Sequence, residues 1–204
     1  MSDETGGDDF ERVAVVKKLE RVHDGFFKVD KATVSHSTFG GGRLTVTREC
    51  LERGDAAAVI LLDRKAKTVW LVEQFRYPTL EKSGGWIEEL AAGIVREGED
   101  PEASAAREVA EETGFEVKSL ERAGAFYVSP GGTSERIFLF MAIVERAKRS
   151  QAVMDARKDD EEDIRLVETS VDDFIANATN GRINDAKTLV GALWLAANRD
   201  RLRI

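Results

Sequence analysis

The pattern of hydrophobic and polar residues predicts strands in the first part of the chain. Residues 26–36 and 42–50 alternate in polarity on either side of the glycines at 40–42, which is typical of antiparallel strands joined by a tight turn. The apolar runs 57–62 and 68–72 flank a short polar segment and predict a hairpin with at least one buried strand. These segments indicate a small β subdomain followed by the first strands of a further sheet.

The second half of the chain adds one short apolar run and two helices. The Phe- and Ile-rich run 137–144 is too short for anything but a buried strand or a piece of helix. Residues 171–179 and 186–197 predict helices. The second helix places five apolar residues at helical spacing: Leu189, Val190, Leu193, Trp194 and Ala197. A mixed sheet flanked by helices, an α/β fold, is the architecture that these elements predict.

A helix with clear signals at both ends is predicted after residue 99. Asp100 is a good N-cap residue, Pro101 suits the first helical position, and Gly114 favours the end of a helix. Glu102 in the first turn interacts favourably with the helix dipole. The predicted helix is therefore about thirteen residues long.

One face of this helix is acidic. At about 100° per residue, Glu108 and Glu112 lie within about 40° of each other, and Glu111 lies about 60° to the other side. The opposite face carries small apolar residues, which are Ala103, Ala106, Val109 and Ala110. Clustered like charges destabilise an isolated helix by roughly a few tenths of a kcal/mol, and a hard divalent cation such as Mg²⁺ explains their presence. A solvated acidic face is the alternative.

Composition and charge narrow the possible functions. The 204 residues carry a net charge of −8, with 30 Lys+Arg against 38 Asp+Glu, which excludes a protein that coats nucleic acid through a basic surface. A content of 42% hydrophobic residues is enough for a buried core. With only Cys50, His23 and His36 available, one chain cannot assemble a Cys/His zinc cluster, so any bound metal must use carboxylates.

The sequence also indicates a cellular compartment. It contains no apolar run of the roughly 20 residues that a membrane-spanning helix needs, and its acidic N-terminus does not resemble a signal peptide. A single cysteine cannot form an internal disulfide, which favours a reducing environment. We therefore expect a cytoplasmic protein that has no membrane or nucleic-acid partner.

The segment 93–115 matches a longer pattern than a helix requires. It reads G-x5-E-x7-R-E-V-x-E-E-x-G-F, and every defined position is occupied: Gly93, Glu99, Arg107, Glu108, Val109, Glu111, Glu112, Gly114 and Phe115. This pattern resembles the signature of the Nudix hydrolases, which cleave nucleoside diphosphates linked to another moiety. The resemblance implies a Nudix-type α/β/α sandwich with a mixed sheet, in which a loop-helix-loop binds Mg²⁺, with Mn²⁺ as a substitute.

The resemblance also implies roles for individual residues. The implied metal ligands are the carbonyl of Ala92 and the carboxylates of Glu108, Glu111 and Glu112. Glu112 would also be a principal catalytic group. Arg107 would orient the carboxylates, Glu99 would anchor the loop, and Gly93 and Gly114 would allow bends of the backbone.

Segments outside the signature resemble the ADP-ribose pyrophosphatase branch of the family. The loop SPGGTSER at 129–136 is similar to a substrate loop of that branch, in which Glu135 would contact the substrate or the catalytic water. Arg48 and Arg76 match arginines that contact ADP-ribose, and guanidinium groups suit a diphosphate. Phe26 matches an aromatic residue that stacks on adenine. The alternative for the loop is a simple Pro-Gly turn. The alternative for the two arginines is a surface ion pair, and that for Phe26 is a place in the hydrophobic core.

Five consecutive acidic residues occupy positions 159–163. By resemblance, this run aligns with a loop that carries catalytic acids, which favours Glu162, and then Glu161 or Asp160, as general base or additional metal ligand. A solvated acidic loop is the alternative.

We therefore expect a Mg²⁺-dependent enzyme that hydrolyses ADP-ribose to AMP and ribose 5-phosphate. Residues 1–54 are expected to form a flexible tail and a small antiparallel β subdomain for dimerisation and substrate contacts, and residues 55–204 the Nudix domain. The resemblance implies a domain-swapped homodimer. The alternatives are a GDP-mannose or other nucleoside-sugar pyrophosphatase, a non-catalytic nucleotide-sensing Nudix module, and an acidic protein that binds Ca²⁺ without turnover.

Overall fold

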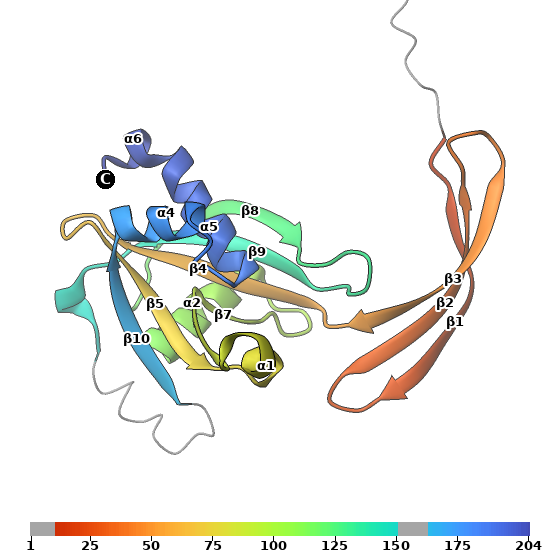
Figure 1. Ribbon diagram of the computed structural model, residues 1–204, viewed down its shortest axis with the longest axis horizontal. Helices are drawn as coiled ribbons and strands as arrows, with labels where there is room; N and C mark the ends of the chain where they lie inside the picture. Colours follow the sequence, from red (N-terminus) through yellow and green to blue (C-terminus); the bar gives the residue numbers. More distant parts are fainter. Residues whose placement is uncertain (1–10, 151–162) are drawn as a thin grey trace, which may run out of the picture. The chain divides into compact units, whose positions relative to one another are not determined.

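A computed structural model describes residues 11–150 and 163–204, and these residues form two compact units. The first unit consists of the N-terminal part up to Arg53 together with the loop Ser129–Ser134. The second unit consists of Gly54–Val128 and Glu135–Ile204. Each unit has its own β-sheet (Figure 1).

Within the described residues, the first unit is an antiparallel sheet of three strands in the order β1-β2-β3. β1 spans Ala14–Asp24, β2 spans Lys28–Ser37 and β3 spans Arg43–Glu52. β2 and β3 are the two strands predicted around the glycine turn, in which Gly41 and Gly42 have φ angles of 76° and 116°. Glycine adopts such angles at little steric cost, so the turn can be tight.

The sequence pattern did not predict β1, whose eleven residues are all exposed. The register of its pairing with β2 shifts between Val16 and Lys18 and again between Arg21 and His23. Such shifts break the two-residue alternation of polarity that marks a strand in a sequence. The strand is therefore evident from its pairing and not from its periodicity.

The loop Ser129–Ser134 is held against β3 by hydrogen bonds. The Leu51 N–H donates to the Gly132 carbonyl at 2.8 Å, and the Ser134 N–H donates to the Leu51 carbonyl at 3.1 Å. The Ser134 hydroxyl accepts the Arg53 N–H at 2.9 Å. The Pro-Gly turn of the SPGGTSER segment thus packs on the N-terminal sheet.

The sheet of the second unit is mixed and has seven strands among the described residues. Five follow the order β10-β5-β4-β9-β8, while β6 pairs with β5 and β7 with β4. β4 and β9 run parallel, and the other pairs are antiparallel. The strands are β4 Asp55–Asp63, β5 Thr68–Phe75, β6 Trp86–Glu89, β7 Ala91–Ile94, β8 Glu121–Tyr127, β9 Arg136–Ile143 and β10 Ile164–Ser170.

Helices pack on this sheet, and three of them were predicted. α2, α4 and α5 match the helices expected from the sequence. In the described part of the chain, the α-helices are α1 Leu80–Ser83, α2 Pro101–Thr113, α4 Val171–Thr179, α5 Ala186–Ala197 and α6 Arg199–Leu202, and 3₁₀ turns lie at Tyr77–Thr79 and Arg146–Lys148. Within residues 11–150 and 163–204, every helix is too short or too polar to cross a membrane.

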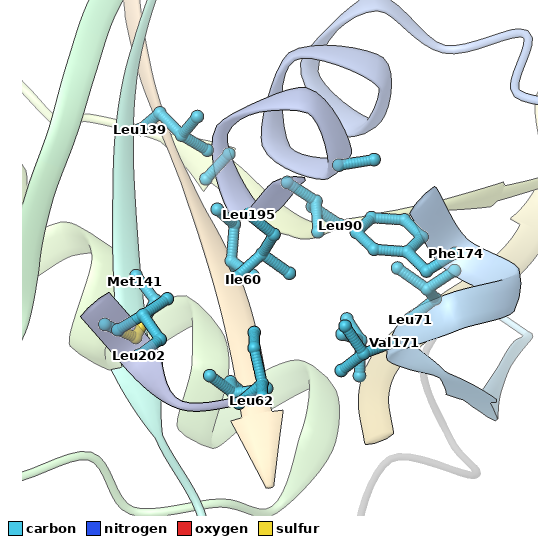
Figure 2. Close-up of a cluster of buried hydrophobic side chains, with 14 of the residues drawn as sticks. Ile60, Leu62, Leu71, Leu90, Leu139, Met141, Val171, Phe174, Leu195 and Leu202 are labelled. Atoms are coloured by element: carbon cyan, nitrogen blue, oxygen red, sulfur yellow. The ribbon is translucent and has the colours of Figure 1, made fainter. Parts of the chain in front are cut away.

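Alternate residues of β4 pack into two hydrophobic cores. Ile60 and Leu62 belong to a core that includes side chains of α4 and α5, whereas Val59 and Leu61 belong to one that includes side chains of α2. Figure 2 shows the first core, in which Leu195 of α5 lies beside Ile60. Because opposite faces of the sheet are covered by different helices, the expected α/β/α sandwich is confirmed.

The buried face of α5 differs from the one that the apolar spacing indicated. The buried residues are Thr188, Gly191, Ala192 and Leu195, whereas Val190 and Leu193 are 37% and 47% exposed. A Cβ added at Gly191 would lie 2.8 Å from Cδ1 of Leu90 and 3.2 Å from Cγ1 of Ile60. The helix therefore approaches the sheet through its small residues, which leaves Val190 and Leu193 partly exposed.

Candidate active site

Helix α2 is fixed at both ends by residues that the sequence singled out. The Asp100 carboxylate accepts the N–H groups of Glu102 and Ala103 at 3.0 and 3.2 Å. Pro101 opens the helix, and Gly114 ends it with a φ angle of 72°. These caps provide hydrogen-bond partners for backbone groups that have none within the helix. They also fix where the helix begins and ends, and so which turns carry its acidic residues.

The acidic face of α2 is divided between a buried and an exposed part. Glu112 is 5% exposed, whereas the side chain of Glu111 is 46% exposed. Ala103, which lies at the edge of the predicted apolar face, is exposed. The buried residues of the helix are Ser104, Ala105, Val109, Glu112 and Thr113. Glu112 follows Val109 by three residues, so it lies only about 60° from the buried centre of the helix face.

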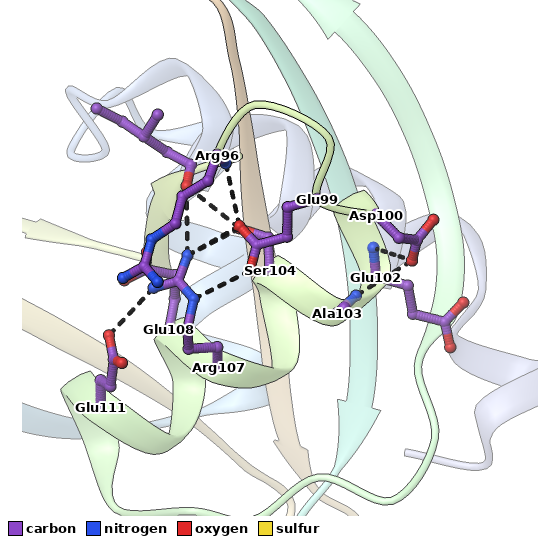
Figure 3. A network of polar contacts seen from close by, with 10 residues as sticks. Arg96, Glu99, Asp100, Glu102, Ala103, Ser104, Arg107, Glu108 and Glu111 are labelled. Atoms are coloured by element: carbon purple, nitrogen blue, oxygen red, sulfur yellow. Dashed lines mark hydrogen bonds and ion pairs between the residues drawn. The ribbon is translucent and has the colours of Figure 1, made fainter.

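Arg107 links the acidic residues of the site (Figure 3). Its guanidinium donates to both oxygens of Glu99, from Nε at 3.1 Å and from Nη2 at 3.2 Å. Nη1 donates to Glu108 at 2.6 Å and to Glu111 at 3.2 Å. The hydrogen bond to Glu99 is the main reason why the pKa of Arg107 is raised, so this cation is permanent. One guanidinium thus orients three carboxylates.

Glu99 ties the loop before α2 to this arginine. In addition to Arg107, it binds the backbone of Arg96, whose N–H donates to Oε2 at 3.0 Å. The hydrogen bond from Arg107, followed by the one from Arg96, lowers the pKa of Glu99 to about 2. The carboxylate is therefore ionised at neutral pH, where it holds the loop.

The lowered pKa of Glu99 predicts an acid-sensitive contribution to stability. An unfolded glutamate titrates near pH 4.3, roughly, so the contribution is complete above that pH and is lost as the pH falls toward about 2. We expect Glu99→Gln to lower the free energy of unfolding at neutral pH, and the difference from the wild type to shrink as the pH falls through this window. Urea unfolding of both proteins measures the difference, and a constant difference across the window would contradict the prediction.

The carboxylates of Glu108 and Glu112 both lie against β7. Oε2 of Glu112 accepts the Ala92 N–H at 3.0 Å. A Cβ added to Gly93 would overlap the carboxylate of Glu108. Gly93 is not among the glycines with positive φ, so its role is to leave space for this carboxylate and not to bend the backbone. Two neighbouring residues of one strand therefore set the positions of both carboxylates.

These residues suit a hard divalent cation by their chemistry. Glu108, Glu111 and Glu112 offer carboxylate oxygens, which Mg²⁺ prefers, and the positive charge of Arg107 offsets only part of their charge. Within the described part of the chain, no three His, Cys, Asp or Glu side chains already converge as a metal-binding group. Arg107 holds two of the carboxylates here. A cation bound at this site therefore competes with that arginine for them.

Gly93→Ala is expected to weaken metal binding without unfolding the protein. The added methyl group displaces the Glu108 carboxylate from β7, and mutation of a group that orients a metal ligand typically costs about 10- to 100-fold in metal affinity. The Mg²⁺ concentration for half-maximal activity measures the effect. Gly124→Ala is the matched control, because a Cβ at Gly124 meets no atom within 4 Å. An unchanged Mg²⁺ requirement in Gly93→Ala would show that Glu108 does not need this space.

Two predicted substrate residues, Phe26 and Arg48, belong to the first unit. Phe26 lies between β1 and β2, is 90% exposed, and meets Phe27 edge-on with ring centroids 4.9 Å apart. This exposure rules out a core role within the described chain. Arg48 lies on β3, is exposed, and donates to the Thr47 carbonyl at 2.9 Å.

The other two predicted substrate residues, Arg76 and Glu135, belong to the second unit. Glu135 precedes β9, and its carbonyl accepts the Val128 N–H at 3.2 Å. Arg76 follows β5, and its Nε donates at 2.8 Å to Glu89 of β6, a residue that the sequence analysis missed. The available signal was weak: Glu89 ends a short strand-like run, and a glutamate buried there needs a cationic partner.

The acidic run at 159–163 was expected to supply the general base. Glu161 and Glu162 lie outside the described residues, as do Asp159 and Asp160. Their catalytic role stays a prediction from the sequence.

The sandwich, its acidic helix and the glycine-bounded loop before that helix define a known class of protein. A model of the NUDIX domain matches residues 52–189. The match covers more than half of the chain, which therefore belongs to the Nudix family.

The similar proteins are named for one of two substrates, ADP-ribose or GDP-mannose. An ADP-ribose pyrophosphatase of Haemophilus influenzae is 35% identical over 190 residues, which cover 90% of this chain and 86% of that protein. An ADP-ribose pyrophosphatase of Escherichia coli is 33% identical over 186 residues, covering 90% of this chain and 88% of that protein. A GDP-mannose pyrophosphatase of Yersinia pestis is 34% identical over 175 residues, covering 85% and 86% respectively.

A solved structure has the same fold. The crystal structure of an ADP compounds hydrolase superimposes with a TM-score of 0.70, covering 94% of this chain and 97% of that one. The two sequences are 16% identical. The likeness therefore concerns the fold and not the substrate.

Proposed function

We propose that this Nudix hydrolase cleaves the pyrophosphate bond of a nucleoside diphosphate sugar, and that ADP-ribose, which yields AMP and ribose 5-phosphate, is its main substrate. The observation that carries the proposal is the carboxylate set of α2, oriented by Arg107 and seated against β7. Two relatives named for ADP-ribose, at 35% and 33% identity, support the choice of substrate.

In this proposal the metal is Mg²⁺, with Mn²⁺ as a substitute. The residues that would hold it are Ala92, through its carbonyl, and the carboxylates of Glu108, Glu111 and Glu112. When bound, the cation offsets the charge of the diphosphate and lowers the pKa of a water molecule. Arg107 orients the carboxylates and, through Glu99, keeps the loop in place.

The remaining residues bind the substrate and accept a proton. Arg76 binds the diphosphate, because a guanidinium forms paired hydrogen bonds with phosphate oxygens. Glu135 contacts the substrate or the attacking water. Glu162, or else Glu161, takes the proton from that water as general base. These assignments rest on the resemblance to the ADP-ribose pyrophosphatase branch.

A substrate panel tests the proposed reaction. The protein is incubated in Mg²⁺ with ADP-ribose, ADP-glucose, GDP-mannose, NADH and deoxynucleoside triphosphates, and monophosphate formation is followed. We expect kcat/KM for ADP-ribose to exceed that for each other substrate by about tenfold or more. Metal binding without any phosphate release would instead identify a nucleotide-sensing module or a cation-binding protein.

GDP-mannose is the second candidate substrate. The 34% identity to a GDP-mannose pyrophosphatase favours it almost as strongly as the other relatives favour ADP-ribose. The discriminating quantity is the ratio of the two kcat/KM values, since it reports the difference in transition-state binding. If kcat/KM is higher for GDP-mannose, the proposed substrate is wrong, but the proposed hydrolysis of a pyrophosphate bond stands.

The proposal includes a domain-swapped homodimer. All eleven residues of β1 are exposed, and Val15, Val16, Leu19 and Val22 are between 41% and 63% exposed. Exposed apolar residues on a strand favour association with another chain. In the dimer, Phe26 stacks on the adenine of the substrate and Arg48 contacts ADP-ribose. Light scattering measures the mass in solution, and a mass of one chain would contradict this part of the proposal.

A cytoplasmic location completes the proposal. The single cysteine of the sequence, Cys50, suits a reducing compartment.

A further inference from the structure

The guanidinium of Arg76 is held along one edge. Its Nε donates to Oε1 of Glu89 at 2.8 Å. Among the described residues, neither Nη atom has a hydrogen-bond partner, and the side chain is 43% exposed. The guanidinium is therefore fixed through Nε and offers its two Nη groups to solvent.

The carboxylate that holds Arg76 is buried and has a second cationic partner. The side chain of Glu89 is 5% exposed. Its Oε2 accepts a hydrogen bond from Nζ of Lys187, whose side chain is 13% exposed. Burying a carboxylate is costly unless cations compensate it. Arg76 and Lys187 thus bind opposite oxygens of one buried carboxylate, which restricts its rotation.

Lys187 is itself fixed by the first turn of α5. Its Nζ lies 3.0 Å from Oδ1 of Asp185, the N-cap residue of this helix. Oδ2 of Asp185 accepts the Thr188 hydroxyl at 2.6 Å, and that hydroxyl accepts the Leu90 N–H at 2.9 Å. Leu90 directly follows Glu89. The start of α5 therefore contacts the end of β6 twice, through Lys187 at the Glu89 carboxylate and through Thr188 at the Leu90 backbone.

We propose that Glu89 and Lys187 are positioning residues for Arg76: together they hold its Nε edge so that both Nη groups face the diphosphate of the substrate. This inference rests on the proposed function and deepens it, since it explains how an arginine on a connecting segment is kept in a binding orientation. A bidentate contact with phosphate needs such an orientation, and a freely rotating side chain loses more entropy in making it.

A double-mutant cycle tests the inference. KM and kcat for ADP-ribose, and the dissociation constant of ADP-ribose in EDTA, are measured for the wild type, Glu89→Gln, Arg76→Ala and the double variant. We expect Glu89→Gln to raise KM and the dissociation constant by about tenfold, as for the loss of one charge-assisted hydrogen bond, with kcat changed by less than about twofold. Because Glu89 acts through Arg76, the double variant should equal Arg76→Ala.

A second variant covers the case in which Glu89→Gln does not fold. Lys187→Met removes the second cation but keeps the contact between Glu89 and Arg76. We expect it to raise KM, to have no further effect when Arg76 is replaced by alanine, and to be rescued by Lys187→Arg. Glu121→Gln is the matched control, because it breaks an exposed ion pair with Arg201 and should leave KM unchanged. Thermal unfolding of each variant reports its stability.

The outcomes separate this inference from the proposed function. If the increases in KM and in the dissociation constant caused by Glu89→Gln and Arg76→Ala multiply in the double variant, Glu89 does not act through Arg76. The positioning role would then be overturned, and the proposed reaction would stand. Binding of ADP-ribose without hydrolysis by the wild type would overturn the reaction, and the cycle on the dissociation constant would still decide the positioning role. A wild type that neither binds nor hydrolyses any substrate of the panel would overturn both.

Discussion

Glu112→Gln is expected to lower kcat by a factor on the order of 10² to 10⁴ while the protein stays folded, as for the loss of a principal catalytic group. Glutamine keeps the size of glutamate and an oxygen that can accept the Ala92 N–H, which donates to Oε2 of Glu112 at 3.0 Å. The substitution therefore removes the charge that a divalent cation needs and little of the packing. Steady-state kinetics at saturating Mg²⁺, together with thermal unfolding, measures both effects.

Glu116→Gln is the control for this substitution. Glu116 follows the helix by three residues and is exposed, so neutralising it tests whether any loss of charge in this acidic region reduces turnover. We expect turnover like that of the wild type. If Glu112→Gln also turns over like the wild type, the metal-ligand assignment is wrong and catalysis must use other carboxylates.

Gly191→Val is expected to destabilise the protein by about 1–3 kcal/mol, the usual cost of overpacking a core. The new side chain enters a space where a Cβ already lies 2.8 Å from Leu90 and 3.2 Å from Ile60. Helix propensity favours valine slightly over glycine, so a loss of stability reports the collision with the sheet. The urea concentration at the midpoint of unfolding is the measurement.

The same substitution also tests how α5 supports the site. A displaced α5 moves Asp185, Lys187 and Thr188, which surround Glu89, so we expect KM to rise as well. Ala197→Val places an equal side chain on an exposed position of α5 and should change stability by less than about 0.5 kcal/mol. Equal midpoints for the two variants would mean that α5 can shift outward at no cost.

The sequence predicted the parts of the fold that local signals determine. α2 has an N-cap aspartate, a proline in its first turn and a terminal glycine, and each of these acts through its immediate neighbours. The strands β4, β5 and β9 likewise appear in the sequence as short apolar runs, which predict buried strands. In each case the residues that carry the signal are close together along the chain.

The remaining features depend on contacts between distant segments. Gly93 leaves space for Glu108, fifteen positions later, and Glu89 is paired with Lys187 across a separation of 98 residues. The face that α5 buries is set by how closely Gly191 approaches the sheet, and not by the largest apolar residues of the helix. Neither periodicity nor composition contains this information, so a single sequence identifies the acidic helix but not the groups that support it.

The central strand of the second unit has a consequence for how the chain folds. β4 pairs locally with β5, but its parallel partner β9 begins 81 residues later, with Arg136 opposite Asp55. Closing so long a loop costs more conformational entropy than forming a hairpin, so the pairing of β4 with β9 forms later. During folding, the uncharged run 56–62 therefore has one unpaired edge that can join the same strand of another nascent chain. The strand that supports both cores in the finished protein is thus also a site at which nascent chains can aggregate, and slower synthesis at low temperature should favour soluble protein.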